Sequence, residues 1–143
     1  MTQEDKKLLL KDLYARILYG FTVHRYSDNR DITFGPNELD EFAHFLEYSE
    51  EEEFKPYLRP ISSMTEEEMD QLFDILHIDK DGKDEDWIKI NDVLGIKFFF
   101  PTGKWVENVV EAYDYLNSIH IDYRGLIPMG LALEAPEDMY KTV

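Results

Sequence analysis

A helix, a turn and an apolar tail follow one another in YDYLNSIHIDYRGLIPMGLALEAPEDMY (residues 113–140), with almost no other residues between them. Apolar residues recur at helical spacing in and before this segment, and they predict a helix over about residues 105–119. These residues are Val106, Val109, Val110, Tyr113 and Leu116. Pro128 and Gly130 prevent a long helical continuation. We therefore expect the tail to be at most a short helical turn followed by extended chain.

Two more helices are predicted upstream, each from a capping pattern followed by an apolar stripe. Thr2 with Asp5 resembles a capping box, and Gly20 supplies a residue suited to follow a helix end. The stripe between them is Leu9, Leu10, Leu13, Tyr14, Ile17 and Leu18. Thr65 with Glu68 is a second capping box, and it predicts a helix over residues 66–76. Its stripe is Met69, Leu72, Phe73 and Leu76.

Strands are predicted by alternation and by turn residues. Residues 21–26 alternate as a strand, and residues 32–34 form the second arm of a hairpin. Residues 87–90 and 96–100 make a second pair of strands around residues 91–95. The prolines in residues 55–60 disfavour helix and predict an extended connector.

Residues 38–48 leave two interpretations open. The residues Leu39, Phe42, Ala43 and Leu46 fit a helix, but further aromatic residues make the segment apolar around much of its girth, so a β-hairpin remains an alternative. With either choice we predict a single α+β domain over residues 1–143. It would have three main helices packed on a small antiparallel sheet of three to five strands.

The charge is strongly negative and unevenly distributed. The net charge is −16, and residues 35–70 alone carry 12 acidic and 2 basic residues. Without a basic patch the chain is not expected to bind nucleic acid or an acidic membrane surface directly. A basic protein partner, unidentified from the sequence, a cation, or no partner at all remain open. Disorder is excluded because 43% of the residues are hydrophobic and 14% are aromatic.

Localisation and cofactors are addressed mainly by what the sequence lacks. It has no cysteine, and its charged start shows no signal peptide, so we expect a cytoplasmic protein. No run approaches the roughly 20 apolar residues that span a bilayer. No dinucleotide or phosphate-binding loop is found, so no cofactor is expected.

The residues His120, Asp122 and Arg124 are the candidate catalytic residues. A carboxylate two residues from a histidine could fix its tautomer for acid–base chemistry. No known nucleophile or metalloprotease motif accompanies them. A structural interpretation is favoured: His120 would complement the dipole at a helix end, Asp122 would cap the next turn, and Arg124 would pair locally with a carboxylate.

The candidate metal ligands are His77, Asp79 and Asp81, because alternate oxygen ligands of a loop can converge on one cation. The segment does not fit an EF-hand. If Asp79 opens the loop, Asp84 replaces the sixth-position glycine and Ile90 replaces the final glutamate. A solvated acidic loop is the alternative interpretation.

Two segments carry a resemblance to a known family. They are KPYLRPISSMTEEE (residues 55–68) and the closing run with HIDYRGLI (residues 120–127) and GLALEAP (residues 130–136). They resemble an uncharacterised family of small proteins from gut-dwelling anaerobic bacteria and their phage or mobile elements. The family has no known activity to carry over. The acidic segment 35–54 departs from relatives that look more strand-like there, which is what keeps the hairpin alternative open.

Three functions remain after these exclusions. The first is a non-enzymatic accessory or interaction protein of mobile-element origin. The second is an acidic inhibitor that mimics nucleic acid and occupies a basic partner, since spaced carboxylates steer basic proteins over long range. The third is an enzyme that uses His120, Asp122 and Arg124.

Overall fold

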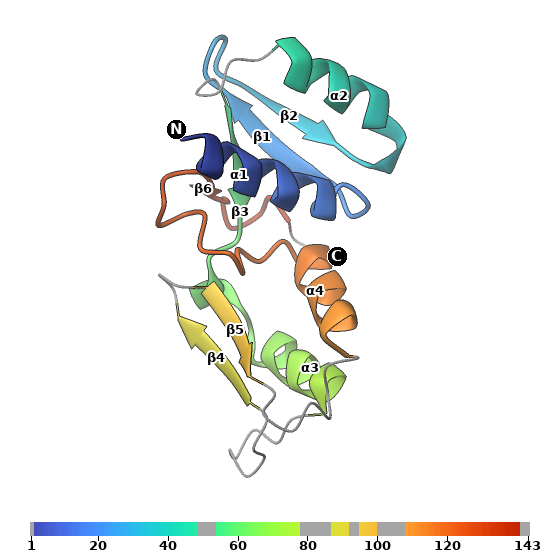
Figure 1. The fold of residues 1–143 in the computed structure, drawn as a ribbon, viewed down its shortest axis with the longest axis vertical. Helices are drawn as coiled ribbons and strands as arrows, with labels where there is room; N and C mark the ends of the chain where they lie inside the picture. The colour runs from blue at the N-terminus through green and yellow to red at the C-terminus, as the bar shows by residue number, and fades with distance from the viewer. Residues whose placement is uncertain (1, 49–53, 78–86, 92–94, 100–107, 141–143) are drawn as a thin grey trace. The chain divides into compact units, whose positions relative to one another are not determined.

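The computed structural model describes the chain except for residues 1, 49–53, 78–86, 92–94, 100–107 and 141–143 (Figure 1). Its contacts divide the chain into two compact units. Unit 1 comprises Met1–Leu58 and Leu126–Val143, and unit 2 comprises Arg59–Gly125. Helices and strands occur in both units, which confirms the predicted α+β class. That residues 1–143 form one domain stays a prediction.

Unit 1 begins with helix α1, Gln3–Arg16, and its start is the capping box expected from the sequence. The hydroxyl of Thr2 accepts the Asp5 N–H at 3.0 Å, and the Asp5 carboxylate accepts the Thr2 N–H at 3.3 Å. After the helix, Gly20 adopts a φ of +81°, a left-handed conformation that glycine takes without steric cost. The chain can therefore turn directly into the first strand.

The sheet of unit 1 has the order β2-β1-β3-β6. Strands β1 (Phe21–Arg25) and β2 (Arg30–Phe34) form the predicted hairpin, and β3 (Phe54–Leu58) pairs antiparallel with β1. The expected extended connector thus begins as a strand. The short strand β6 (Leu133–Glu134) lies parallel to β3, so the C-terminal tail completes the sheet.

Residues 36–48 are helical, which removes the β-hairpin alternative. A single 3-10 turn, η1 (Pro36–Glu38), leads into helix α2 (Leu39–Tyr48). The Glu38 carboxylate accepts the Gly35 N–H at 3.1 Å and caps this turn. The apolar residues of α2 therefore follow helical spacing, as the favoured interpretation predicted.

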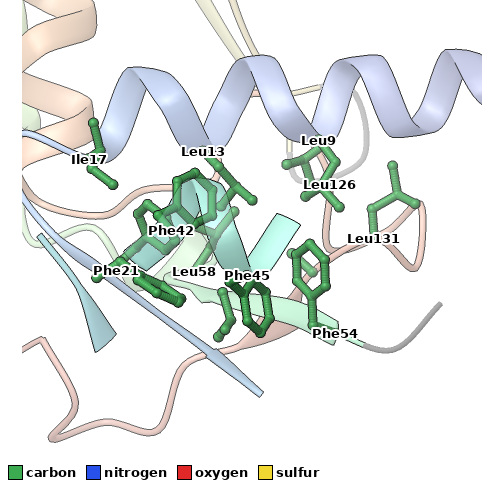
Figure 2. Packing of buried hydrophobic residues seen from close by; sticks show 13 residues of the cluster. Leu9, Leu13, Ile17, Phe21, Phe42, Phe45, Phe54, Leu58, Leu126 and Leu131 are labelled. Atoms are coloured by element: carbon green, nitrogen blue, oxygen red, sulfur yellow. The ribbon is translucent and has the colours of Figure 1, made fainter. Parts of the chain in front are cut away.

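The core of unit 1 lies between the sheet and its two helices (Figure 2). Alternate residues of β1 point to opposite faces, so Phe21 and Val23 enter the core while His24 lies on the other face. Four aromatic rings from three elements meet in this core. They are Phe21 on β1, Phe34 on β2, and Phe42 and Phe45 on α2. The tail adds Leu126, Leu131 and Ala132.

Unit 2 contains the 3-10 turn η2 (Ile61–Ser63) and two helices. Helix α3 (Glu66–Leu76) has the predicted bounds, and α4 (Val109–Ser118) lies within the predicted helix 105–119, whose first residues are outside the described part. Leu72 and Leu76 of α3 pack with Leu116 of α4 in one apolar cluster. The helices of unit 2 are thus held by aliphatic packing.

Strands β4 (Trp87–Asn91) and β5 (Gly95–Phe99) pair as the predicted hairpin. The Ile96 N–H donates to the Tyr123 carbonyl at 2.9 Å. Gly95 has a φ of +86°, and a Cβ at this position would collide with the same carbonyl oxygen. Glycine is therefore required where the hairpin meets the segment after α4.

Candidate functional site

Helix α1 carries apolar side chains on two sides, and only one of them faces the core. Leu9, Leu13 and Ile17 are buried, whereas Tyr14 is 53% exposed and Leu18 is 69% exposed. Neighbouring helix residues are separated by about 100° around the axis, so residues on both sides of Leu13 compete for the core, and Asp12 is buried there while Tyr14 is not. The prediction of a single six-residue stripe was too wide.

The remaining space on the buried side is filled by charge. Asp12 and Arg16 are both fully buried, and they lie one helical turn apart. The Arg16 guanidinium donates twice to the Asp12 carboxylate, from Nε at 2.7 Å and from Nη2 at 3.1 Å. Buried charges persist only when paired and hydrogen-bonded. The buried side of α1 therefore combines this ion pair with Leu9 and Leu13, while Tyr14 remains exposed.

The outward side chain of Tyr14 on α1 lies beside α2. The Tyr14 ring packs edge-on against Phe42, with centroids 5.5 Å apart. Leu39, one turn before Phe42, is 50% exposed. We call Tyr14, Leu18 and Leu39 the anchor surface. Scattered exposed apolar residues are ordinary on proteins, but apolar side chains gathered over two helices are typical of binding surfaces.

Helix α2, which carries Leu39, also carries exposed carboxylates. Asp40 and Glu47 are exposed and seven residues apart, so they share one face of the helix. Helix α2 contains no lysine or arginine. Among the residues that the structure describes, neither carboxylate enters a salt bridge. Their charge is therefore available to an external group.

The open face of the sheet in unit 1 holds a polar network around His24. Nδ1 of His24 lies 2.8 Å from Oδ1 of Asp31 on the neighbouring strand, and the Tyr57 hydroxyl donates to the same oxygen at 3.0 Å. The rings of Tyr26 and Tyr57 lie edge-on to the His24 ring, at 4.8 and 6.3 Å. Three strands thus contribute to one cluster. Alternation predicted the shared face of His24 and Tyr26, but pairing across strands was not visible in the sequence.

The pKa shifts in this network follow from its hydrogen bonds. The hydrogen bond from His24 lowers the pKa of Asp31, although partial desolvation opposes the shift, and the Tyr57 hydroxyl lowers it further. Burial raises the pKa of Tyr57, and its hydrogen bond to Asp31 adds to this effect. An ionised Asp31 carboxylate can only accept a hydrogen bond, so Nδ1 of His24 must be the nitrogen that donates the N–H. The tautomer of His24 is therefore fixed.

A fixed histidine would support catalysis only beside a reacting group. The hydroxyls of Thr22 and Thr33 lie on the same face but bond to each other at 2.8 Å, and the Tyr57 hydroxyl is engaged with Asp31. The described contacts thus tie strands together. They support a structural role for the His24 network.

The predicted catalytic residues lie in unit 2, immediately after α4. His120 has a φ of +65°, and its carbonyl accepts the Arg59 N–H at 2.8 Å. Asp122 is buried, and its N–H donates to the Arg59 carbonyl at 2.9 Å. The Arg124 guanidinium lies 5.1 Å from the centroid of the Tyr123 ring. The segment is thus anchored through its backbone to Arg59, and a catalytic role for its side chains stays a prediction.

The Arg59 side chain is the hub of this region, and the sequence did not indicate it. Its guanidinium donates to both carboxylate oxygens of Glu68, at 2.8 and 2.7 Å. It also donates to the carbonyl oxygens of Ile119 and Ser63, at 3.2 and 2.8 Å. One side chain therefore joins the start of α3 to the end of α4.

The predicted metal site cannot be assessed, because Asp79 and Asp81 lie outside the described residues. His77, the third member, is exposed and ends α3 in a left-handed conformation with a φ of +55°. Within the described ranges no three His, Cys, Asp or Glu side chains are grouped as a metal site. The described helices also include none that is long and apolar enough to cross a membrane.

No protein-family model, curated protein sequence or solved structure matches this chain. Functional inference therefore rests on the surfaces and contacts described above.

Proposed function

We propose that the protein is a non-enzymatic interaction protein that binds a basic protein partner through the anchor surface. The observation that carries the proposal is the exposure of apolar side chains at the end of α1: Tyr14 is 53% exposed, and Leu18, in the turn that follows, is 69% exposed. Apolar side chains placed in water gain their favourable transfer free energy only when a partner covers them. The acidic charge of α2 favours a partner that is basic.

The resemblance to an uncharacterised family from phages and mobile elements is compatible with an accessory role but carries no activity and no partner. In this proposal the net charge of −16 keeps the free protein soluble and steers it to a basic surface.

Site-specific crosslinking in lysate of the cell that encodes the protein tests the proposal. A photoreactive amino acid at position 18 should crosslink to a basic protein, whereas the same group at position 110 should not. Val110 is a matched control, because it is 68% exposed and Leu18 is 69% exposed. Equal crosslinking from both positions, or none from position 18, would contradict the proposal.

Nucleic-acid mimicry is distinguished by salt. A purely electrostatic mimic should lose its partner steeply as ionic strength rises and should compete with DNA for it. Binding through the anchor surface should keep much of its strength in salt, because apolar burial is not screened.

A further inference from the structure

The anchor surface is made of helix and turn residues and contains no strand edge. Tyr14 lies in α1, Leu18 lies in the turn after it, and Leu39 is the first residue of α2. Strand addition needs an exposed sheet edge with free N–H and C=O groups. Recognition at this surface must therefore be between side chains, as when a helix lies against other helices.

The spacing of the anchors fits a helical partner. Tyr14 lies in the last turn of α1, and Leu18 follows four residues later in the turn that ends the helix, so the two side chains are about one helical turn apart. Apolar residues of a partner helix at positions i and i+4 have the same separation and can interdigitate with them. Leu39, one turn before the Phe42 that contacts Tyr14, adds an apolar group from the second helix.

The charges around the surface are asymmetric and indicate how the partner is polarised. Lys11, an exposed residue three positions before Tyr14, lies on the α1 side. Asp40 and Glu47 lie on α2, which has no lysine or arginine, although His44 lies between them. The basic side of a partner helix should therefore face α2. A second copy of this chain is disfavoured as the occupant, because each copy has a net charge of −16.

We propose that the anchor surface binds an amphipathic helix whose apolar stripe covers Tyr14, Leu18 and Leu39 and whose flanking lysines or arginines contact Asp40 and Glu47. This inference rests on the proposed function and specifies the partner's chemistry. The apolar stripe provides affinity, and the carboxylates set the orientation and the rate of association.

The test uses the full chain and three synthetic peptides of roughly 15 residues, a length at which an isolated helix becomes tenable. The first has leucines at helical spacing and lysines elsewhere. The second has the same composition without a stripe, and the third replaces lysine by glutamate. Calorimetry should show binding of the first peptide at least about 10-fold tighter than of the other two, and amide chemical-shift changes should centre on α1 and α2. Equal binding of the striped and unstriped peptides would overturn the inference.

Matched variants locate the binding. Leu18→Asp should weaken the striped peptide at least about 10-fold, as expected for loss of an anchor. Val110→Asp adds the same charge at an equally exposed apolar position and should change affinity less than about 2-fold. Because the added carboxylate attracts lysines, weaker binding by Leu18→Asp must come from lost apolar contact. Unchanged binding by Leu18→Asp would place the peptide elsewhere and refute the proposal.

The charge arm uses two further variants. Asp40→Asn combined with Glu47→Gln should weaken the striped peptide several-fold at low salt and flatten its salt dependence. Lys11→Ala should not weaken it. If Lys11→Ala weakened peptide binding more than the Asp40→Asn/Glu47→Gln variant did, the assigned orientation of the partner helix would be wrong.

The two proposals can fail separately. If crosslinking at position 18 captures a basic protein but Leu18→Asp leaves peptide affinity unchanged, the proposed function stands and the helical partner is refuted. If the peptide binds through Leu18 but position 18 crosslinks to nothing in the lysate, the proposed function fails. The inference that the anchor surface can bind an amphipathic basic helix then still holds.

Discussion

Helices α1 and α3 begin in the same way and differ in where they place an arginine–carboxylate pair. Each starts with a threonine capping box, Thr2 with Asp5 and Thr65 with Glu68. In α1 the pair lies within the helix and both side chains are fully buried. In α3 the capping Glu68 itself accepts Arg59 from outside the helix, and these side chains are 18% and 20% exposed.

This difference shows two uses of one interaction. The buried pair of α1 replaces apolar side chains that would otherwise face the core, and it leaves Tyr14 and Leu18 on the surface. The pair of α3 joins segments and leaves the apolar stripe of its helix intact. A buried pair is expensive to break because one charge would remain without compensation, whereas a partly solvated pair is not.

The largest expected effect is that of Arg16→Ala. Removing the guanidinium leaves Asp12 buried without its ion-pair partner, so the free energy of unfolding should fall by about 3–5 kcal/mol. Urea denaturation followed by circular dichroism measures it. The double variant Asp12→Leu/Arg16→Met is the control, because apolar replacement of both partners should restore most of the stability. A single variant as stable as the wild type would show that the pair is not buried.

The pair of α3 should have a smaller effect that depends on pH. The hydrogen bond from Arg59 lowers the pKa of Glu68, with desolvation opposing the shift. A lowered folded-state pKa means that the stabilisation is complete above the unfolded pKa of about 4.3 and is lost as pH falls through the folded value. Glu68→Gln should therefore cost about 1–3 kcal/mol at neutral pH, and the difference from wild type should shrink below the folded pKa.

Urea denaturation at neutral and acidic pH measures this difference. Glu67→Gln, at an exposed neighbouring position, is the control and should change stability by less than about 0.5 kcal/mol. A Glu68→Gln effect that is the same at both pH values would refute the contribution of the ionised pair.

The smallest effects are expected at the two caps. Replacing a capping threonine with alanine costs about 0.5–2 kcal/mol. Thr65→Ala should lie toward the upper end because Arg59 already holds the Glu68 side chain in its capping position, and Thr2→Ala toward the lower end. Thermal denaturation of both variants measures the order, and Thr→Ser at each site should retain most of the stability. A larger loss at Thr2 would contradict the view that Arg59 preorganises the second cap.

Much of the fold could be predicted from local signals. Capping boxes located both helix starts, alternation located β1, and the turn residues after it located the hairpin with β2. The prolines of residues 55–60 correctly excluded helix but concealed strand β3. Pro56 lacks an N–H, yet it is tolerated opposite Val23 because neighbouring residues complete the ladder. Pairing with β1 and β6 depends on residues far away in sequence, so no local pattern could predict it.

The candidate site was harder to predict for a related reason. The sequence of α1 gave six apolar residues, and periodicity alone could not say which of them the core would accept. The distinction depends on Asp12 and Arg16, which pair across one turn and occupy the buried side. Their i, i+4 spacing was present in the sequence, but such pairs usually lie on a solvated face. Burial decided the outcome, and burial is a property of the assembled unit.

Unit 2 is an insertion in the sequence of unit 1, and this order constrains synthesis on the ribosome. Strand β6, the core residue Leu131 and Tyr140, whose hydroxyl donates to the Tyr57 carbonyl at 2.8 Å, all follow residue 125. Because translation proceeds from the N-terminus, all residues of unit 2 emerge before the chain that completes unit 1. Part of the core formed by the first 58 residues therefore stays exposed until the C-terminal segment has been synthesised. Nascent chains halted at residue 125 should accordingly bind chaperones more than the full-length chain does.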